Sequence, residues 1–255
     1  MDEQFFHACL GLCLLGSMCL SFIALALGTV APYGRYSAVK SFDMSWGPPI
    51  NGRVAWVVQE LPSLVGPLVC LHRSGRPSGG NALLLALFLA HYVNRAVVYP
   101  LRIRRGKPTP LGVAAAAFGF TTANGYLQAR ALAAPWARSV PVDARFVAGV
   151  ALLCAGAAGN VWHDGVLRDL RRGGGGGYEI PRGGLFEYVS GANFLCEIIE
   201  WFGFAVAART PAAWVFAASA ALNIGPRGVH HHRWYLATFG ADYPADRRAI
   251  VPFLL

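Results

Sequence analysis

Long apolar stretches alternate with short polar segments along almost the whole chain. Seven stretches are long enough to be membrane helices, which need about 20 mainly apolar residues. They cover residues 5–30, 54–72, 81–101, 109–133, 144–168, 186–209 and 212–235. The pattern predicts an all-α integral membrane protein, a seven-transmembrane-helix bundle in which residues 1–255 form a single polytopic domain.

Composition and the positions of the basic residues support this interpretation. Hydrophobic residues make up 55% of the chain and charged residues 14%, whereas soluble domains carry about 25% charged residues. The odd-numbered loops and the C-terminal tail hold 15 of the Lys and Arg residues, and the even-numbered loops hold 6. We therefore expect a lumenal N-terminus and a cytosolic C-terminus. The net charge of +9 then reflects loops beside lipid headgroups and indicates no nucleic-acid binding.

Three local features refine the expected topology. The acidic start and the length of the first apolar stretch exclude a cleavable signal peptide, so residues 1–52 are expected to form an anchor helix and a loop. Pro62 and Pro67 lie inside the second span and should kink it, which frees backbone carbonyls. Five glycines at 173–177 match no phosphate-binding motif and predict a flexible linker.

Polar side chains recur at helical spacing in the last three spans. An ionisable group near a bilayer centre costs roughly 2.5–3.5 kcal/mol and is a functional-site hypothesis by default. The stripes consist of Asn160, Asp164, Arg168 and Arg171, then Asn193, Glu197 and Glu200, then Arg227, His231 and Tyr235. Together they would line a pocket suited to a large, phosphate-bearing ligand. Hydrogen bonds that only join helices are the alternative, but those rarely need two carboxylates and several arginines on three helices.

Histidine and cysteine positions do not indicate a metal site. Successive helical residues point about 100° apart, so His230, His231 and His232 cannot ligate one ion. All 6 cysteines fall within apolar spans and show no CxxC or zinc spacing, which is typical of packing residues.

A second polar set lies in the first half of the chain. Glu60 lies inside the second span, and Tyr92 lies inside the third, with Arg95 one turn further on. An apolar environment favours a protonated carboxyl, so Glu60 could donate a hydrogen bond as Tyr92 does. Two donors on one carbonyl fit reduction of an enone, because negative charge develops on the ketone oxygen. The alternative is a Glu60 bonded to a carbonyl freed by Pro62 or Pro67.

Several longer segments carry a resemblance to a known family. They are AWVVQELPS (55–63), HYVNR (91–95), RGKPTP (105–110), NGYLQAR (124–130), PRGGLFEYVSGANFLCEIIEW (181–201), HHHRWYL (230–236), YP (243–244) and VPFLL (251–255). From about Arg53 to the end, the chain resembles the steroid 5α-reductases (3-oxo-5α-steroid 4-dehydrogenases), and most of all their type 1 branch. The resemblance implies a multi-pass enzyme of the endoplasmic reticulum membrane. Its reaction would be NADPH-dependent reduction of the 4,5 double bond of 3-oxo-Δ4-steroids such as testosterone, progesterone and androstenedione.

The resemblance also implies roles for individual residues. Glu60 and Tyr92 would hold the C3 ketone while hydride passes to C5. The implied cofactor residues are Asn160, Asp164, Arg171, Tyr178, Asn193, Glu197, Arg227, His231 and Tyr235. Residues 53–142 would then form the steroid-site helices, and residues 143–255 the NADPH-binding C-terminal region. The basic clusters Arg104–Lys107 and Arg168–Arg172 would favour NADPH over NADH on the cytosolic side. The steroid would enter from the bilayer among membrane lipid, and no obligate protein partner is expected.

Two departures and three alternatives accompany this interpretation. Family members usually read Lys-Pro-Gly where this chain has its glycines, and NIHSD where it has NVWHD at 160–164, so His163 is assigned no role. A reductase of another conjugated alkene, such as a polyprenal or an enoyl thioester, would use the same architecture. A membrane methyltransferase would share a similar cofactor region. A transporter is disfavoured because the chain shows no internal repeat.

Overall fold

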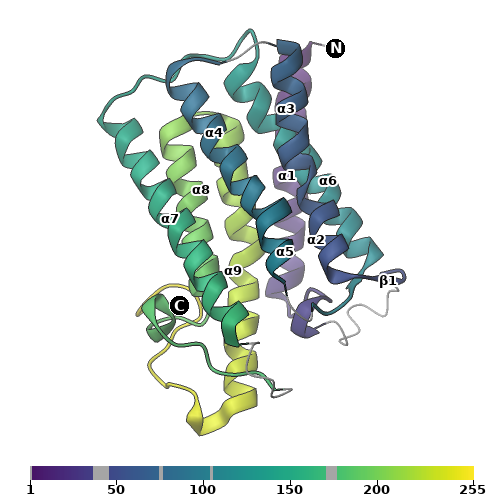
Figure 1. The fold of residues 1–255 in the computed structure, drawn as a ribbon, viewed down its shortest axis with the longest axis vertical. Coiled ribbons are helices and arrows are strands. Elements are labelled where there is room, and N and C mark those ends of the chain that lie inside the picture. The colour runs from purple at the N-terminus through teal and green to yellow at the C-terminus, as the bar shows by residue number, and fades with distance from the viewer. Residues whose placement is uncertain (1, 37–45, 75–76, 104–105, 171–176) are drawn as a thin grey trace.

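The protein is a bundle of long helices. The computed structural model describes residues 2–36, 46–74, 77–103, 106–170 and 177–255. The helices are α1 (Glu3–Ala26), α2 (Gly52–Glu60), α3 (Pro62–Ser74), α4 (Gly79–Val93), α5 (Tyr99–Arg102), α6 (Leu111–Ala133), α7 (Ala144–Asp169), α8 (Ala192–Ala208) and α9 (Pro211–Phe239). They stand along the long axis, with α7 packed against α8, α3 against α6 and α1 against α9 (Figure 1). The predicted all-α class is confirmed apart from a two-stranded ribbon of β1 (Pro49–Ile50) and β2 (Thr109–Pro110).

The apolar character of the bundle supports a membrane protein. In the described part of the chain, four helical stretches are long and apolar enough to cross a membrane: residues 3–26, 52–73, 79–102 and 144–169. The predicted spans on α6, α8 and α9 form helices but do not meet that measure. The seven-helix count and the orientation of the termini therefore stay predictions.

The second predicted span is broken into α2 and α3, as its prolines lead one to expect. The break falls at Leu61, because Pro62 has no N–H with which to continue the helix. Thr121 of α6 donates its hydroxyl to the Gln59 carbonyl at 2.6 Å, which satisfies an acceptor beside the break. Pro67 lies inside α3, which continues past it. Glu60 is the last residue of α2, so the break in the helix lies directly beside it.

The third predicted span changes its winding near its end. α4 passes into a π-helical turn, Asn94–Val98, and then into α5. Such turns are rare and are frequent at functional sites. Arg95 lies in this turn, three residues after Tyr92. The wider turn alters the direction of the Arg95 side chain from the one that regular helical spacing predicts.

Glycines allow α7 and α8 to approach each other closely. A Cβ atom added at Gly156 would overlap the Glu200 backbone nitrogen and lie 2.6 Å from the Cys196 carbonyl oxygen. Gly149 and Gly203 meet the partner helix in the same way. Small residues at such positions let membrane helices pack backbone to backbone. This contact fixes the distance between the polar stripes of the two helices.

Replacing Gly156 with alanine should lower the stability of the protein by about 1–3 kcal/mol, the usual cost of overpacking. The thermal unfolding midpoint in detergent micelles measures the effect. Gly119 of α6 supplies the matched control, because a Cβ there meets nothing within 4 Å. Gly119→Ala should keep or raise the midpoint, since alanine favours helix over glycine. Equal losses in both variants would show that close packing at Gly156 is not the cause.

The sixth predicted span requires a correction. α8 begins at Ala192 and has 17 residues, so the expected membrane-length helix over 186–209 is wrong in its first turn and a half. The backbone N–H groups of Ser190 and Gly191 donate to the carbonyls of Arg248 and Ala249, at 2.8 and 2.9 Å. These donors are therefore used by the C-terminal tail, and the helix starts only after them.

The tail is held against this segment by a buried arginine. Arg247 donates from Nη1 to the Pro181 carbonyl at 2.9 Å and lies 3.3 Å from Glu187 Oε2. The Gly183 N–H donates to Glu187 as well, and together with Arg247 it holds the pKa of that carboxyl below its usual range. The hydroxyl oxygens of Ser190 and Tyr243 lie 2.6 Å apart and form a further hydrogen bond. The chain end thereby fixes the position at which α8 begins.

Candidate functional site

Arg95 lies at the centre of the polar interior. Its Nη1 atom is 3.3 Å from Asp164 Oδ2 on α7, and its Nη2 atom is 4.0 Å from Glu60 Oε1 at the end of α2. The guanidinium packs on the rings of Trp56 and Tyr99, 4.8 and 5.2 Å from their centroids. A buried charge persists only when it is paired, and here one cation serves carboxylates from two helices. Arg95 thus joins the predicted ketone-binding residue to a predicted cofactor residue.

Amides and carboxylates of α7 and α8 form a continuous cluster beside Arg95. Asn193 donates from Nδ2 to Asp164 Oδ1 at 2.9 Å. Asn160 donates to the Asn193 carbonyl at 3.0 Å and approaches Glu197 Oε2 at 3.5 Å. The structure therefore brings the predicted stripes of these two helices face to face. We call Asn160, Asp164, Asn193 and Glu197 the amide–carboxylate cluster.

The stripe on α9 meets this cluster at Phe194. The Arg227 guanidinium lies between two rings, 4.8 Å from the centroid of Tyr33 and 5.3 Å from that of Phe194. The His231 ring lies 5.2 Å from the Phe194 ring. Because Phe194 directly follows Asn193 on α8, the α9 stripe lies next to the amide–carboxylate cluster. In the described part of the chain, no hydrogen bond joins Arg227, His231 or Tyr235 to the amide–carboxylate cluster.

Arg35 and Tyr36, which follow α1 in the chain, lie beside the α9 stripe. Arg35 donates from Nη2 to Tyr235 Oη at 3.2 Å, and the Tyr36 ring lies 5.6 Å from the His231 ring. Burial raises the pKa of Tyr36 to about 12, although Arg35 opposes the shift. Within the described residues, Arg35 Nη1 and Tyr36 Oη are buried without a hydrogen-bond partner. Unsatisfied buried donors call for an explanation, and a bound ligand is one.

Aromatic rings surround the Arg35 guanidinium. The centroids of Trp234, Tyr235 and Tyr178 lie 4.5, 4.7 and 5.2 Å away. Lys107 Nζ lies 5.6 Å from the centroid of the Tyr178 ring. Cations beside flat rings form a surface that suits a ligand carrying both phosphates and aromatic bases. We call Arg35, Tyr36, Lys107, Tyr178 and Tyr235 the cation–aromatic region.

Tyr92 is buried next to a chain of amides. Its hydroxyl oxygen lies 3.5 Å from Asn124 Nδ2, and Gln128 donates to Asn124 Oδ1 at 3.0 Å. The Tyr92 ring packs on Phe88 with centroids 4.8 Å apart. Glu60 is close enough to interact electrostatically with this hydroxyl. Asn124 and Ser63 are thus both hydrogen-bond neighbours of the Tyr92 hydroxyl.

His91 forms a separate buried pair with Glu200. The His91 Nδ1 and Glu200 Oε1 atoms lie 2.7 Å apart, and the side chains are 7% and 1% exposed. The His91 ring also lies edge-on to Trp201, with centroids 4.5 Å apart. The pair connects α4 to α8 directly beside Tyr92. Sequence spacing placed Glu200 on the α8 stripe but did not indicate its partner.

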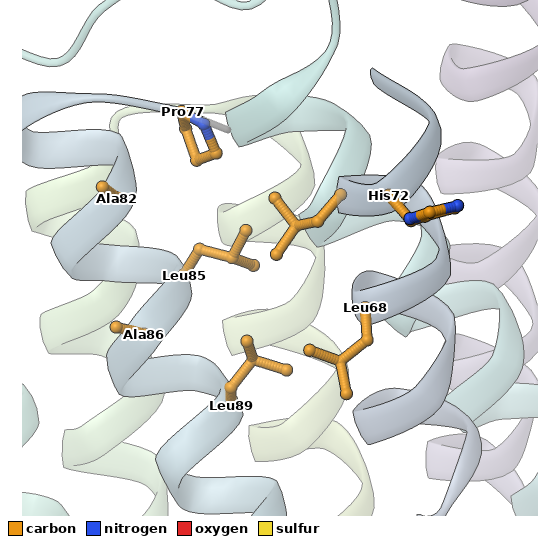
Figure 2. Close-up of a pocket in the computed structure, with 8 residues that line it drawn as sticks. Leu68, His72, Pro77, Ala82, Leu85, Ala86 and Leu89 are labelled. Atoms are coloured by element: carbon orange, nitrogen blue, oxygen red, sulfur yellow. The ribbon is translucent and has the colours of Figure 1, made fainter. Parts of the chain in front are cut away.

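An apolar groove of about 640 Å³ opens between α3 and α4 (Figure 2). It is lined by Leu68, Leu71, His72, Pro77, Ala82, Leu85, Ala86 and Leu89. Leu85 and Leu89 point from α4 towards Leu68 on α3 (Figure 2). Leu89 precedes Tyr92 by three residues, about 4.5 Å along the helix axis. The mainly apolar groove therefore extends along α4 to within one helical turn of Tyr92.

The structure leaves one predicted arginine unplaced and adds one that the sequence analysis missed. Arg171 lies outside the described residues. The Arg168 Nε atom lies 3.8 Å from Asp169 Oδ1, and Arg168 also acts electrostatically on Asp164, one turn earlier on α7. Arg35 was missed because the first fifty residues showed only the character of an anchor. Its signal was a basic residue between two tyrosines, directly after a membrane helix.

Comparisons with known proteins match the whole chain to one family. Residues 107–255 match the family described as 3-oxo-5-alpha-steroid 4-dehydrogenase. The chain is 44% identical to 3-oxo-5-alpha-steroid 4-dehydrogenase 1 of Bos taurus, over 95% of this chain and 94% of that protein. It is 45% identical to the Homo sapiens protein of the same description, over 89% and 87%. It is 39% identical to Steroid 5-alpha-reductase DET2 of Gossypium hirsutum, over 99% and 98%.

Proposed function

The chain belongs to the 3-oxo-5-alpha-steroid 4-dehydrogenase family of oxidoreductases, and from this membership we propose that it reduces the 4,5 double bond of 3-oxo-Δ4-steroids with NADPH. Testosterone, progesterone and androstenedione are the proposed substrates. The observation that carries the proposal is Arg95, which joins Glu60 to Asp164. A ketone-binding end and a cofactor-binding end in one buried network are what transfer of hydride between two bound molecules requires.

The proposed ketone end consists of Glu60 and Tyr92. As the alkene is reduced, negative charge develops on the C3 oxygen, and two donors aimed at that oxygen stabilise it. The Tyr92 phenol carries a proton that it can donate to the ketone oxygen, while Asn124 donates to the Tyr92 oxygen. Burial around Phe88 excludes water from this end, which strengthens each donor. Glu60 is the second donor when it carries its proton.

The proposed cofactor end combines the amide–carboxylate cluster with the cation–aromatic region. NADPH, when bound, supplies the hydride. Amides and carboxylates suit the ribose and carboxamide groups of such a ligand. Arg35 Nη1, which has no hydrogen-bond partner among the described residues, suits a phosphate. Arg227, His231, Tyr178 and Tyr235 stand along the same surface. Arg171 is kept in the proposed set from the sequence alone.

The proposed setting is the membrane of the endoplasmic reticulum. We propose seven spans with a lumenal N-terminus and a cytosolic C-terminus, so that NADPH reaches its end from the cytosol. The steroid enters from the bilayer, into which such an apolar substrate partitions. The basic loops support this orientation.

Reconstituted protein tests the proposed reaction directly. The purified chain in lipid nanodiscs is mixed with testosterone and NADPH, and in parallel with NADH or with a polyprenal. Formation of dihydrotestosterone with NADPH is expected, and much slower formation with NADH. Consumption of the polyprenal without any steroid product would move the activity to another conjugated alkene and overturn the proposed substrate.

Arg35→Gln should weaken NADPH binding by at least about tenfold, because a buried charge-assisted hydrogen bond contributes roughly 1.5–3 kcal/mol. Affinity for NADH should change less if the lost partner is the additional phosphate. Quenching of protein fluorescence by each cofactor measures both constants without turnover. Arg53→Gln, at the exposed first turn of α2, is the matched control and should leave both constants unchanged. Unchanged NADPH affinity in Arg35→Gln would remove the cation–aromatic region from the cofactor site.

A further inference from the structure

The His91–Glu200 pair has the geometry of an oriented acid–base group. Glu200 Oε1 holds His91 Nδ1 at 2.7 Å, and both side chains are almost fully buried. Within the described part of the chain, His91 Nε2 has no hydrogen-bond partner, and Glu200 Oε2 is buried without one. A carboxylate at one imidazole nitrogen fixes the ring and leaves the other nitrogen to move a proton.

A purely structural histidine in the same protein has a different pattern. His163 of α7 donates from Nδ1 to the Gly159 carbonyl at 2.6 Å and accepts from the Leu185 N–H at Nε2 at 3.1 Å. Both of its ring nitrogens are used by the backbone, so no proton can be transferred without breaking the fold. His91 differs because a carboxylate, not a carbonyl, holds one nitrogen and the other stays available.

The His91–Glu200 pair lies between the proposed ketone end and the proposed cofactor end. His91 directly precedes Tyr92 on α4, and Arg95 follows four residues later. His91 and Arg95 both act electrostatically on Asp164 of α7, so His91 lies near the cation that holds this carboxylate. The charged groups around His91 are Glu200 and Glu197 of α8, Asp164 of α7, Glu60 of α2 and Arg95 of its own segment.

Reduction of the alkene leaves one proton unassigned. Hydride forms a C–H bond at C5, the 4,5 π bond breaks, and its electron pair moves through C4 to the C3 oxygen as an enolate. A second C–H bond must then form at C4 while the ketone is restored. Glu60 and Tyr92 stabilise the oxygen, but a group placed between the ketone and the cofactor end is better situated to protonate C4.

We infer that His91 donates this proton from Nε2 and that Glu200 is its positioning residue. The N–H bond of the imidazolium breaks as the C4–H bond forms, which leaves a neutral imidazole beside the Glu200 carboxylate. Solvent then returns one proton to the pair for each turnover. This inference rests on the proposed reductase function and extends it to the step that neither Glu60 nor Tyr92 performs.

His91→Gln and Glu200→Gln test the inference, because an amide can keep a hydrogen bond between the helices but cannot supply the proton. A general acid typically contributes about 10²–10⁴-fold, so kcat should fall by that range in His91→Gln and less in Glu200→Gln. KM for the steroid and the dissociation constant of NADPH should stay within about twofold. The solvent deuterium isotope effect on kcat should increase as protonation becomes limiting.

The pH dependence of kcat distinguishes a proton donor from a residue that only holds two helices together. A donor must carry its proton, so wild-type kcat should fall on the alkaline side, and this limb should disappear from the His91→Gln profile. Glu200→Asp, which restores a carboxylate, should recover part of the rate. His163→Gln is the matched control and should keep the alkaline limb. A His91→Gln enzyme that keeps both the limb and kcat would overturn the inference.

Folding and the proposed function are checked within the same experiment. NADPH binding measured by fluorescence shows whether each variant retains its site. If the wild type reduces steroid while His91→Gln binds NADPH and turns over normally, only the proton donor is wrong. If the wild type reduces no steroid at all, the proposed function fails and the inference that rests on it fails too.

Discussion

Replacing Glu60 with glutamine should lower kcat/KM for testosterone by about 10²–10³-fold, the usual effect of losing one donor to a developing oxyanion. Glutamine keeps the size of the side chain but is a much weaker acid than a carboxyl group, so it stabilises the enolate oxygen less. Binding of NADPH should stay nearly intact, because glutamine keeps the volume of the side chain and Arg95 keeps its contact with Asp164. Initial rates at varied testosterone, with NADPH saturating, measure the change.

Asp242→Asn supplies the matched control for Glu60→Gln. Asp242 is an exposed carboxylate after α9, so its amide should leave the rate unchanged. A Glu60→Gln enzyme with near wild-type kcat/KM would show that Glu60 does not polarise the ketone. Glu60 would then be only the counter-charge of Arg95, 4.0 Å away.

The helical architecture could be predicted because it depends on local composition. Apolar length predicted the helices of the described chain apart from the late start of α8, and helical spacing grouped Asn160 with Asp164 and Asn193 with Glu197. The break at Pro62 was also predictable, since a missing backbone N–H acts within one turn. Such features need no knowledge of distant segments.

Features that depend on distant contacts could not be predicted. α8 starts late because Arg248 and Ala249 take the backbone donors of Ser190 and Gly191, more than fifty residues earlier in the chain. Arg35 enters the site only because the segment after α1 packs on α9. No periodicity within one segment carries such information, and the same holds for the partnership of His91 with Glu200.

Arg95→Gln should destabilise the protein by about 3–5 kcal/mol, the usual cost of removing one partner from a buried ion pair. Glu60 and Asp164 would remain buried without their shared cation, and both side chains are at most 15% exposed. The thermal unfolding midpoint in nanodiscs, measured without ligands, reports the loss apart from catalysis. Arg145→Gln is the matched control, because this arginine of α7 is exposed and its side chain donates to the Val206 carbonyl at the surface.

The double variant Arg95→Gln with Asp164→Asn separates charge from packing. If unpaired negative charge causes the loss, neutralising Asp164 should recover a large part of the midpoint, although NADPH binding stays weak. If the loss comes from the packing of Arg95 on Trp56 and Tyr99, the second substitution should recover nothing. Recovery of stability would identify the unpaired charge of Asp164 as the cause of the loss in Arg95→Gln. A stable Arg95→Gln protein would instead show that the two carboxylates tolerate burial without this cation.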